Sequence, residues 1–134
     1  MNQKMQIKRC IKIWENRLLR LEADASRQRA EVNECRKRYD DSVSEVARQE
    51  EHTKAELQQL NEQLKCQVLS IDDLNRSLRS ERSALDKLDK KRGQVSLNQS
   101  ALTAAEVELE AKKKCVSDAL KKTEKYKTVY ASME

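Results

Sequence analysis

Hydrophobic positions in the first half of the chain recur at alternating steps of four and three residues. This period places them on one stripe of a long α-helix, as in a coiled coil. Two successive steps of four, through Cys35, Tyr39 and Val43, predict a stutter that locally unwinds a left-handed supercoil. The predicted stripe consists of Ile7, Ile11, Trp14, Leu18, Leu21, Ala25, Gln28, Val32, Cys35, Tyr39, Val43, Val46, Glu50, Thr53, Leu57, Leu60 and Leu64.

The second half of the chain repeats in the same way but in a register of its own. Its apolar row, at seven-residue steps from Leu88 to Val116, is unbroken, whereas the alternate row is polar from Arg92 to Lys113. Such a narrow seam is typical of a helix that packs on one other helix and not on a globular core. The predicted seam consists of Leu74, Leu78, Glu81, Leu85, Leu88, Arg92, Val95, Gln99, Leu102, Glu106, Leu109, Lys113, Val116, Leu120, Thr123, Lys127 and Tyr130.

The two registers meet in the stretch CQVLSIDDLNRSL, residues 66–78. Ser70 is a suitable N-cap, and Asp72 and Asp73 would place negative charge in the first turn of a helix that follows it. The alternative is one uninterrupted helix, which the absence of Gly and Pro from the turn favours. We predict an all-α fold, a long antiparallel two-helix coiled-coil hairpin forming one domain over residues 1–134, with helix one at about 3–68, a turn at about 68–70 and helix two at about 71–132.

Folding the chain at this turn brings the two stripes together. Leu64 then faces Leu78, and the two charges that interrupt the stripes, Glu50 and Arg92, face each other. We expect these charges to form a part-solvated ion pair that contributes no more than about 1 kcal/mol to stability. Gly93, beside Arg92, marks a point where a bend is expected in a helix that continues through it.

The composition excludes an ordinary globular domain. Charged residues make up 38% of the chain and aromatic residues 3%, with no Pro and a single Gly. A globular core needs more apolar volume and more turn residues. A disordered chain would lack the apolar periodicity, so a coiled coil is the better interpretation.

Positive charge is concentrated toward both ends of the chain. Residues 1–30 hold 8 Lys/Arg against 3 Asp/Glu, and residues 110–134 hold 7 against 4. A hairpin would join these ends in one basic tip, which suits an acidic protein pore, lipid headgroups or nucleic acid. Nucleic acid is the least favoured, because acids are interleaved with the bases and Trp14, the single Trp, lies at a seam position and not on a stacking face.

The sequence contains no motif for catalysis or for binding a metal or a cofactor. His52, the only histidine, lies in the charged stretch RQEEHTKAE, and is expected at the surface. Cys35 lies on the apolar stripe and is expected to be buried as a small hydrophobic side chain. Cys10, Cys35, Cys66 and Cys115 are too widely spaced for a zinc site. We therefore expect a protein that is not an enzyme and that has no catalytic residue, no metal site and no cofactor.

The sequence also predicts where the protein is found. No apolar run approaches the roughly 18–20 residues of a transmembrane helix. The first residues, MNQKMQIKRCIKIW, are interrupted by charges and do not resemble a signal peptide. Four scattered thiols fit a reducing compartment, so a cytoplasmic protein without direct membrane insertion is expected.

Three stretches resemble a known family. They are the basic amphipathic MQIKRCIKIWENRLLRLEA near the N-terminus, the central LSIDDLNRSLRSERSALDKL, and the Lys-rich KKKCVSDALKKTEKYKTVY. Together they resemble the small central-stalk proteins of type III secretion systems, the YscO (SctO) family, and their flagellar relative FliJ. The resemblance implies an antiparallel α-hairpin that enters the pore of the hexameric secretion ATPase, contacts the cytoplasmic domain of the export gate and, in some members, binds export chaperones.

This resemblance implies that the two ends of the hairpin carry the function. The basic tip is expected to dock on the ATPase through Lys8, Arg9, Lys12, Lys121, Lys122 and Lys125. The turn end offers an apolar patch suited to the export gate, formed by Ile71, Leu74 and Leu78. We expect a monomer that binds no nucleic acid. The alternative is a generic coiled-coil scaffold, or a dimerising structural protein, that is unrelated to secretion.

Overall fold

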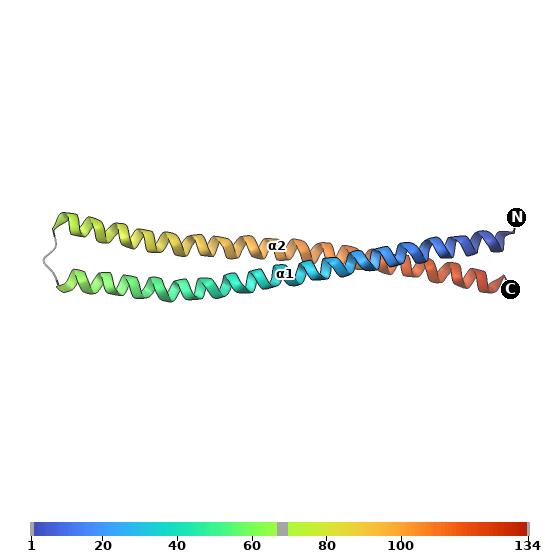
Figure 1. Ribbon diagram of the computed structural model, residues 1–134, viewed down its shortest axis with the longest axis horizontal. Coiled ribbons are helices and arrows are strands. Elements are labelled where there is room, and N and C mark those ends of the chain that lie inside the picture. The colour runs from blue at the N-terminus through green and yellow to red at the C-terminus, as the bar shows by residue number, and fades with distance from the viewer. Residues whose placement is uncertain (1, 67–69, 134) are drawn as a thin grey trace. The chain divides into compact units, whose positions relative to one another are not determined.

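The computed structural model describes residues 2–66 and 70–133 and forms two helices. Helix α1 spans Gln3–Cys66 and helix α2 spans Ile71–Ser132. They pack against each other as a helical hairpin (Figure 1). The predicted all-α hairpin is therefore confirmed, and the single uninterrupted helix is excluded. The predicted end of helix one at residue 68 and most of the turn lie outside the described residues.

Polar caps begin both helices. The Asp73 amide donates to Ser70 Oγ at 3.2 Å, and the Leu74 amide donates to the Ser70 carbonyl at 3.0 Å. Ser70 is thus the N-cap of α2, as predicted, with Asp72 and Asp73 in the first turn. At α1 the Lys4 amide donates to Asn2 Oδ1 at 3.1 Å. Asn2 is a second N-cap, one that the sequence analysis did not identify.

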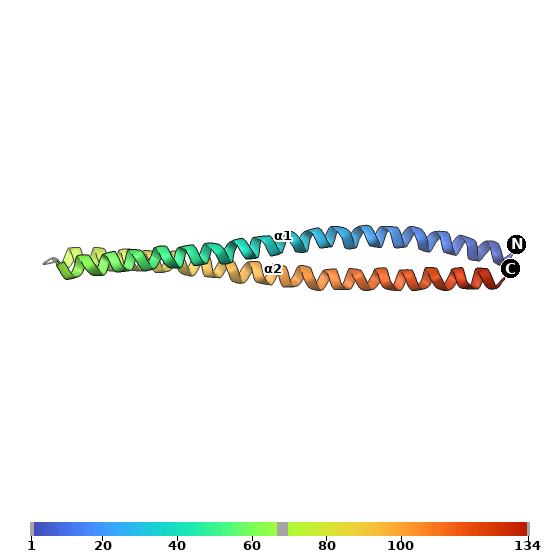
Figure 2. The same ribbon diagram turned by 90° about the horizontal axis from the view of Figure 1, so that it is seen from below.

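The contacts of the hairpin fall into two compact units. Unit 1 combines Met1–Glu34 with Thr103–Glu134, and unit 2 consists of Cys35–Leu102. Figure 2 shows the hairpin from a second direction. Each unit contains a segment of α1 and a segment of α2, and each has its own buried seam.

The seam of unit 1 is built mainly from small side chains. The buried side-chain amide of Gln28 is satisfied, because its Nε2 donates to the Ala105 carbonyl at 3.0 Å. Thr123, only 1% exposed, donates from Oγ1 to the Ala119 carbonyl at 2.9 Å. These hydrogen bonds therefore offset the unfavourable free energy of burying the two polar side chains. The buried residues of this unit are Ala25, Gln28, Val32, Ala105, Leu109, Ala119 and Thr123.

The seam of unit 2 has the same character in its middle. Its buried residues are Cys35, Ser42, Thr53, Ala84 and Leu88. Burial of Cys35 agrees with the prediction. Ser42 Oγ donates to the Tyr39 carbonyl at 2.7 Å, so its hydroxyl is satisfied within its own helix. Across the seam, Asn98 Nδ2 donates to the Arg38 carbonyl at 3.3 Å.

The seam of α2 differs from the prediction in one of its two rows. The apolar row from Leu88 to Val116 is buried or half-buried, as expected. The alternate row lies one residue earlier, since Ala84 is 2% exposed whereas Leu85 is 41% exposed. Alanine at the seam lets the two backbones approach closely, and the leucine then stands on the flank. The predicted members Leu78, Leu85, Arg92, Gln99, Glu106, Lys113, Leu120 and Lys127 are replaced by Ser77, Ala84, Lys91, Asn98, Ala105, Lys112, Ala119 and Tyr126. Leu74 and Glu81, predicted in the other row, are exposed as well.

The seam of α1 requires a similar correction. Ser42 is 8% exposed, whereas Val43, its predicted counterpart, is 44% exposed. Steps of four and three therefore continue past Tyr39, and the predicted stutter there is wrong. The shift in spacing comes later, after Thr53, where Glu56 and Leu57 are both half-buried.

Gly93 lies inside α2 without interrupting it. The helix is continuous through this residue, and its backbone has no positive φ. The position is exposed, and a Cβ there would meet nothing within 4 Å. Neither backbone conformation nor close packing therefore requires a glycine at this position.

Candidate functional site

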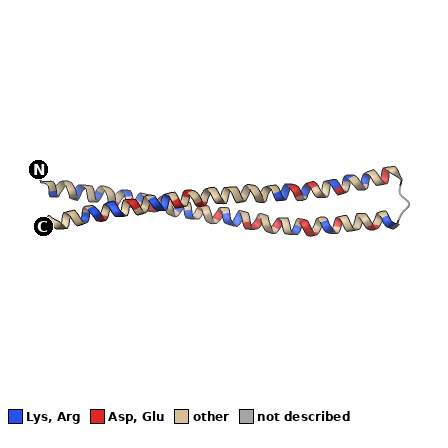
Figure 3. Cartoon of the chain, turned by 180° about the vertical axis from the view of Figure 1, so that it is seen from behind, with Lys and Arg blue, Asp and Glu red and all other residues tan. Residues whose placement is uncertain are grey.

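The basic end of unit 1 gathers positive side chains from both helices. Figure 3 shows these Lys and Arg residues along both segments near the chain termini. The six predicted ATPase-docking residues are all exposed there: Lys8, Arg9, Lys12, Lys121, Lys122 and Lys125. Five of them, all except Lys122, have no ion pair or ring contact with another described residue. Most of this positive charge is therefore available to a partner.

Aromatic rings hold some of the cations at this end. Lys122 Nζ lies 5.4 Å from the centre of the Trp14 ring, and the Arg17 guanidinium lies 4.8 Å from it. Lys4 Nζ lies 5.2 Å from the centre of the Tyr130 ring. Lys122 and Lys4 thus join the two helices through cation–π contacts. The seam positions of Trp14 and Tyr130 were predicted, but these contacts were not.

An ion pair adds to the closure of this end. Lys127 Nζ lies 3.5 Å from Glu15 Oε1, and both side chains are about half exposed. Lys127 was predicted to lie in the seam, and the structure places it on the flank. A surface pair of this kind contributes little to stability. Lys127 is therefore paired within the hairpin, unlike the other exposed lysines of the basic end.

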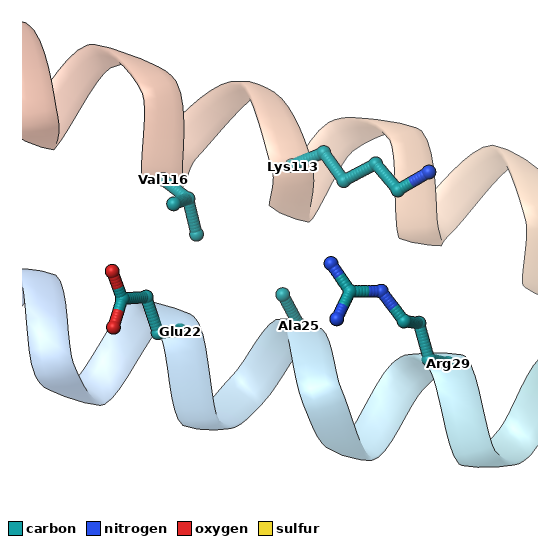
Figure 4. A pocket seen from close by; sticks show the side chains of 5 residues that line it. All are labelled: Glu22, Ala25, Arg29, Lys113 and Val116. Carbon is teal, nitrogen blue, oxygen red and sulfur yellow. The ribbon is translucent and has the colours of Figure 1, made fainter.

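A shallow hollow lies farther along unit 1. Its volume is about 380 Å³ and its lining is Glu22, Ala25, Arg29, Lys113 and Val116. In Figure 4 Ala25 and Val116 point into the hollow from opposite helices, and Arg29 reaches toward it from α1. Lys113 is paired with Glu110 at 3.3 Å. The hollow is open to solvent and holds no enclosed set of polar groups.

The turn end of unit 2 is apolar and open. Ile71 is 78% exposed, and Leu74 and Leu78 are exposed as well, as their predicted role as a contact patch requires. The last two also line a groove of about 100 Å³ between the helices. The groove is lined by Leu57, Leu60, Asn61 and Leu64 of α1 and by Leu74, Ser77, Leu78 and Glu81 of α2. Arg79 and Arg82 line a separate hollow with Leu78, and Arg76 and Arg79 line another with Glu56.

Ion pairs join the helices of unit 2. The predicted pair is present, with Arg92 Nη2 at 3.3 Å from Glu50 Oε1, but both residues are about half exposed and lie beside the seam. Lys91 Nζ donates to Glu45 Oε2 at 3.0 Å. The hydrogen bond and the charge of Lys91 lower the pKa of the Glu45 carboxyl, and the charge of Arg48 adds a smaller effect in the same direction.

The remaining polar groups form no reactive cluster in the part of the chain that the structure describes. His52 Nε2 lies 2.6 Å from Glu56 Oε1, and the imidazole is well exposed, as predicted. Within residues 2–66 and 70–133, no group of three or more His, Cys, Asp or Glu side chains is placed to hold a metal ion. Cys10 is half-buried, Cys35 is buried and Cys115 is exposed, all as free thiols. The side chain of Cys66 lies outside the described set.

Neither described helix, α1 or α2, has a segment apolar enough to span a membrane. Comparisons of the chain with protein-family models, with curated proteins and with solved structures gave no match. The functional interpretation therefore depends on the chain's own residues and on the family resemblance of its sequence.

Proposed function

We propose that the protein is a non-enzymatic stalk of a bacterial type III secretion apparatus. In this role its basic end engages the hexameric secretion ATPase, and its turn end faces the cytoplasmic domain of the export gate. Export chaperones are further partners by the same resemblance. The protein would act in the cytoplasm, beside the inner-membrane apparatus.

The basic end of unit 1 is the observation that carries this proposal. Two helices meet there, and Lys8, Lys12, Lys121 and Lys125 are exposed without an intramolecular ion pair among the described residues. Positive charge on a narrow end accelerates association with an acidic pore and makes association dependent on salt. The two cation–π contacts between the helices support the same role, because they hold α1 and α2 together at this end.

Nucleic acid is a less suitable partner for this end. Arg17 and Lys122 both lie over the Trp14 ring, so this ring is not open to stack on a base. Glu15, Glu22 and Asp24 interrupt the positive charge of α1. An acidic protein surface therefore fits better than a phosphate backbone.

A charge-reversal variant tests the proposal. The triple substitution K8E/K121E/K125E changes exposed residues outside the seam, so helical content should stay intact. The control K54E/K87E/K90E makes the same change in charge at exposed positions of unit 2. The partner is the secretion ATPase encoded by the same genome, with its hydrolysis rate measured at low salt. We expect the first variant to lose binding and stimulation and the control to keep both.

Two outcomes of that experiment count against the proposal. Stimulation that survives K8E/K121E/K125E would exclude the basic end as the docking surface. Equal losses in both triple variants would show that net charge matters and the position of the charge does not. A dimeric mass in solution, without ATPase binding, would instead favour the coiled-coil scaffold.

A further inference from the structure

Two cations from different helices meet at one aromatic ring in the basic end of unit 1. The Arg17 guanidinium of α1 lies 4.8 Å from the centre of the Trp14 ring, and Lys122 Nζ of α2 lies 5.4 Å from it. The two cations cannot be farther apart than these distances taken together, so one short segment of a partner can contact both. Arg17 is exposed and was not among the predicted docking residues.

No acid of the described chain neutralises these two cations. Arg17 and Lys122 form no ion pair with another described residue, and neither does Asp118, which lies one turn from Lys122 on α2. An aromatic ring attracts a cation through its π electrons and accepts none of the hydrogen bonds that the edge of a guanidinium donates. The donors of Arg17 and Lys122 therefore remain open to an anion, while the ring holds both side chains in place.

The seam divides the surface of the basic end into two flanks. Successive residues of an α-helix are about 100° apart, so Glu15 and Arg17, one and three residues after Trp14, lie on opposite sides of this seam residue. The contacts across the seam agree, because Lys122 joins Arg17 at the ring whereas Lys127 pairs with Glu15 at 3.5 Å. We call the two sides the Arg17 flank and the Glu15 flank.

The Arg17 flank carries the larger positive charge. Over residues 5–20 and 117–132 the same helical spacing assigns it four cations and one acid, and assigns the Glu15 flank three cations and two acids. On the Glu15 flank one cation and one acid are also paired with each other. The charged residues of the Arg17 flank are Arg17, Arg20, Asp118, Lys122 and Lys125, and those of the Glu15 flank are Lys8, Lys12, Glu15, Glu124 and Lys127.

We propose that the Arg17 flank is the face of the basic end that binds the partner, and that Arg17 and Lys122 receive carboxylates of an acidic protein segment. The planar fork of Arg17 matches a carboxylate in two parallel hydrogen bonds, and Lys122 adds a second charge from the other helix. Trp14 is a positioning residue, because side chains that are held in place before binding lose less freedom on binding. This inference deepens the proposed function and rests on it for the partner.

Phosphate groups of a membrane or a nucleic acid fit this flank less well. A helix that binds at a membrane interface presents a continuous apolar face, whereas the large apolar side chains exposed on the Arg17 flank are only Ile13 and Val129 in the described chain. Single-stranded nucleic acid gains affinity from bases stacked on aromatic rings, and the two cations occupy the Trp14 ring.

The fluorescence of Trp14 tests the charge of the flank in the full-length chain, because this is its only Trp. Iodide and caesium ions quench the ring from solution, and the ratio of their quenching constants reports the local charge independently of ring exposure. We expect R17Q/K122Q to lower the iodide-to-caesium ratio at least about twofold at low salt. The matched control K8Q/K12Q removes the same charge from the Glu15 flank and should change the ratio much less.

A labelled peptide of ten glutamates tests carboxylate binding. At low salt, fluorescence anisotropy should show binding to the native chain, at least about tenfold weaker binding to R17Q/K122Q, and a loss of about threefold or less in K8Q/K12Q. W14L should weaken binding although the charge is unchanged, and W14F, which keeps a ring, should restore most of it. Circular dichroism checks that each variant keeps its helical content. The secretion ATPase should rank the variants in the same order.

Three results would overturn the inference. They are equal losses in R17Q/K122Q and K8Q/K12Q, equal binding by W14L and W14F, and binding to phosphatidylserine vesicles or single-stranded DNA without binding to the glutamate peptide. Equal losses at the ATPase in the two double variants would leave the proposed function standing without a preferred flank. A native chain that binds the peptide through Arg17 and Lys122 but not the ATPase would instead contradict the proposed function.

Discussion

The two units bury their apolar residues differently toward their ends. On α2 of unit 1, burial continues through Ala119 to Thr123, and cation–π contacts follow. In unit 2 the last buried residues before the turn are Thr53 and Ala84, although more leucines lie beyond them than in any other part of that unit. The leucines nearest the turn are therefore not part of the buried contact between the helices.

The difference follows from the size of the side chains at the seam. Alanine and threonine allow two helices to approach until little solvent reaches the contact, as at Ala84 and Ala119. Near the turn leucines lie on both helices, and a two-helix structure has no third layer to cover the outer half of each side chain. The leucine end is consequently suited to binding, and the alanine-rich segments are suited to holding the hairpin together.

Truncating one leucine in each unit is expected to give the largest contrast. Leu109 is buried in unit 1, so L109A should lower the free energy of unfolding by about 2–4 kcal/mol. Leu78 is exposed in unit 2, and L78A should change it by about 0.5 kcal/mol or less. Urea unfolding followed by circular dichroism measures both. Equal losses would contradict the comparison.

Exchanging neighbours at the seam tests the role of small residues directly. A119L inserts three carbons at a position that is almost fully buried, and overpacking should cost about 1–3 kcal/mol. L120A removes the same volume from an exposed position next to it and should cost about 0.5 kcal/mol or less. A84L and L85A repeat the test in unit 2. If the leucine variants were more stable than the native chain, the corrected row of the α2 seam would be wrong.

The hairpin was predictable because its signals are local and repeated. The capping residue Ser70 and the unbroken row from Leu88 to Val116 both agree with the structure. The alternate row was not predicted, because the choice between Ala84 and Leu85 depends on how closely the helices approach. Hydrophobicity favours the leucine, whereas the structure buries the alanine. The same error placed Val43 in the seam in place of Ser42.

The candidate surfaces were predictable to a smaller extent. Once a hairpin is assumed, the sequence predicts that Lys8 and Lys121 lie at one basic end. It also predicts an apolar patch near the turn that includes Leu74 and Leu78. It does not show that a groove joins these leucines to those of α1, because that depends on where burial stops. Nor does it show that Lys122 is held over Trp14, which requires the angular positions of both residues on their helices.

Replacing Gly93 is expected to stabilise unit 2 by a moderate amount. G93A should raise the free energy of unfolding by about 1 kcal/mol, because Ala has the higher helix propensity and its Cβ would meet no neighbouring atom. S96A, at another exposed position of the same helix, should give a smaller gain of roughly 0.5 kcal/mol. Urea unfolding of the two variants provides the comparison. A loss of stability in G93A would show that the helix needs a glycine at this position.

The smallest effect concerns the Glu45–Lys91 pair, which joins the helices of unit 2 without lying in the seam. Lys91 lowers the pKa of the Glu45 carboxyl, so this carboxyl should stay ionised to a lower pH in the folded chain than in the unfolded one. The pair's contribution to stability is then present above the unfolded pKa and is lost as the pH falls through the folded pKa. Carboxyl NMR of the native chain should show the lowered pKa, and K91M should return it toward its ordinary value. R48M is the matched control and should move it less, because the charge of Arg48 is the weaker cause. A Glu45 pKa that is unaffected by K91M would show that the two side chains do not meet in solution, and that the flank of unit 2 is as open as its turn end.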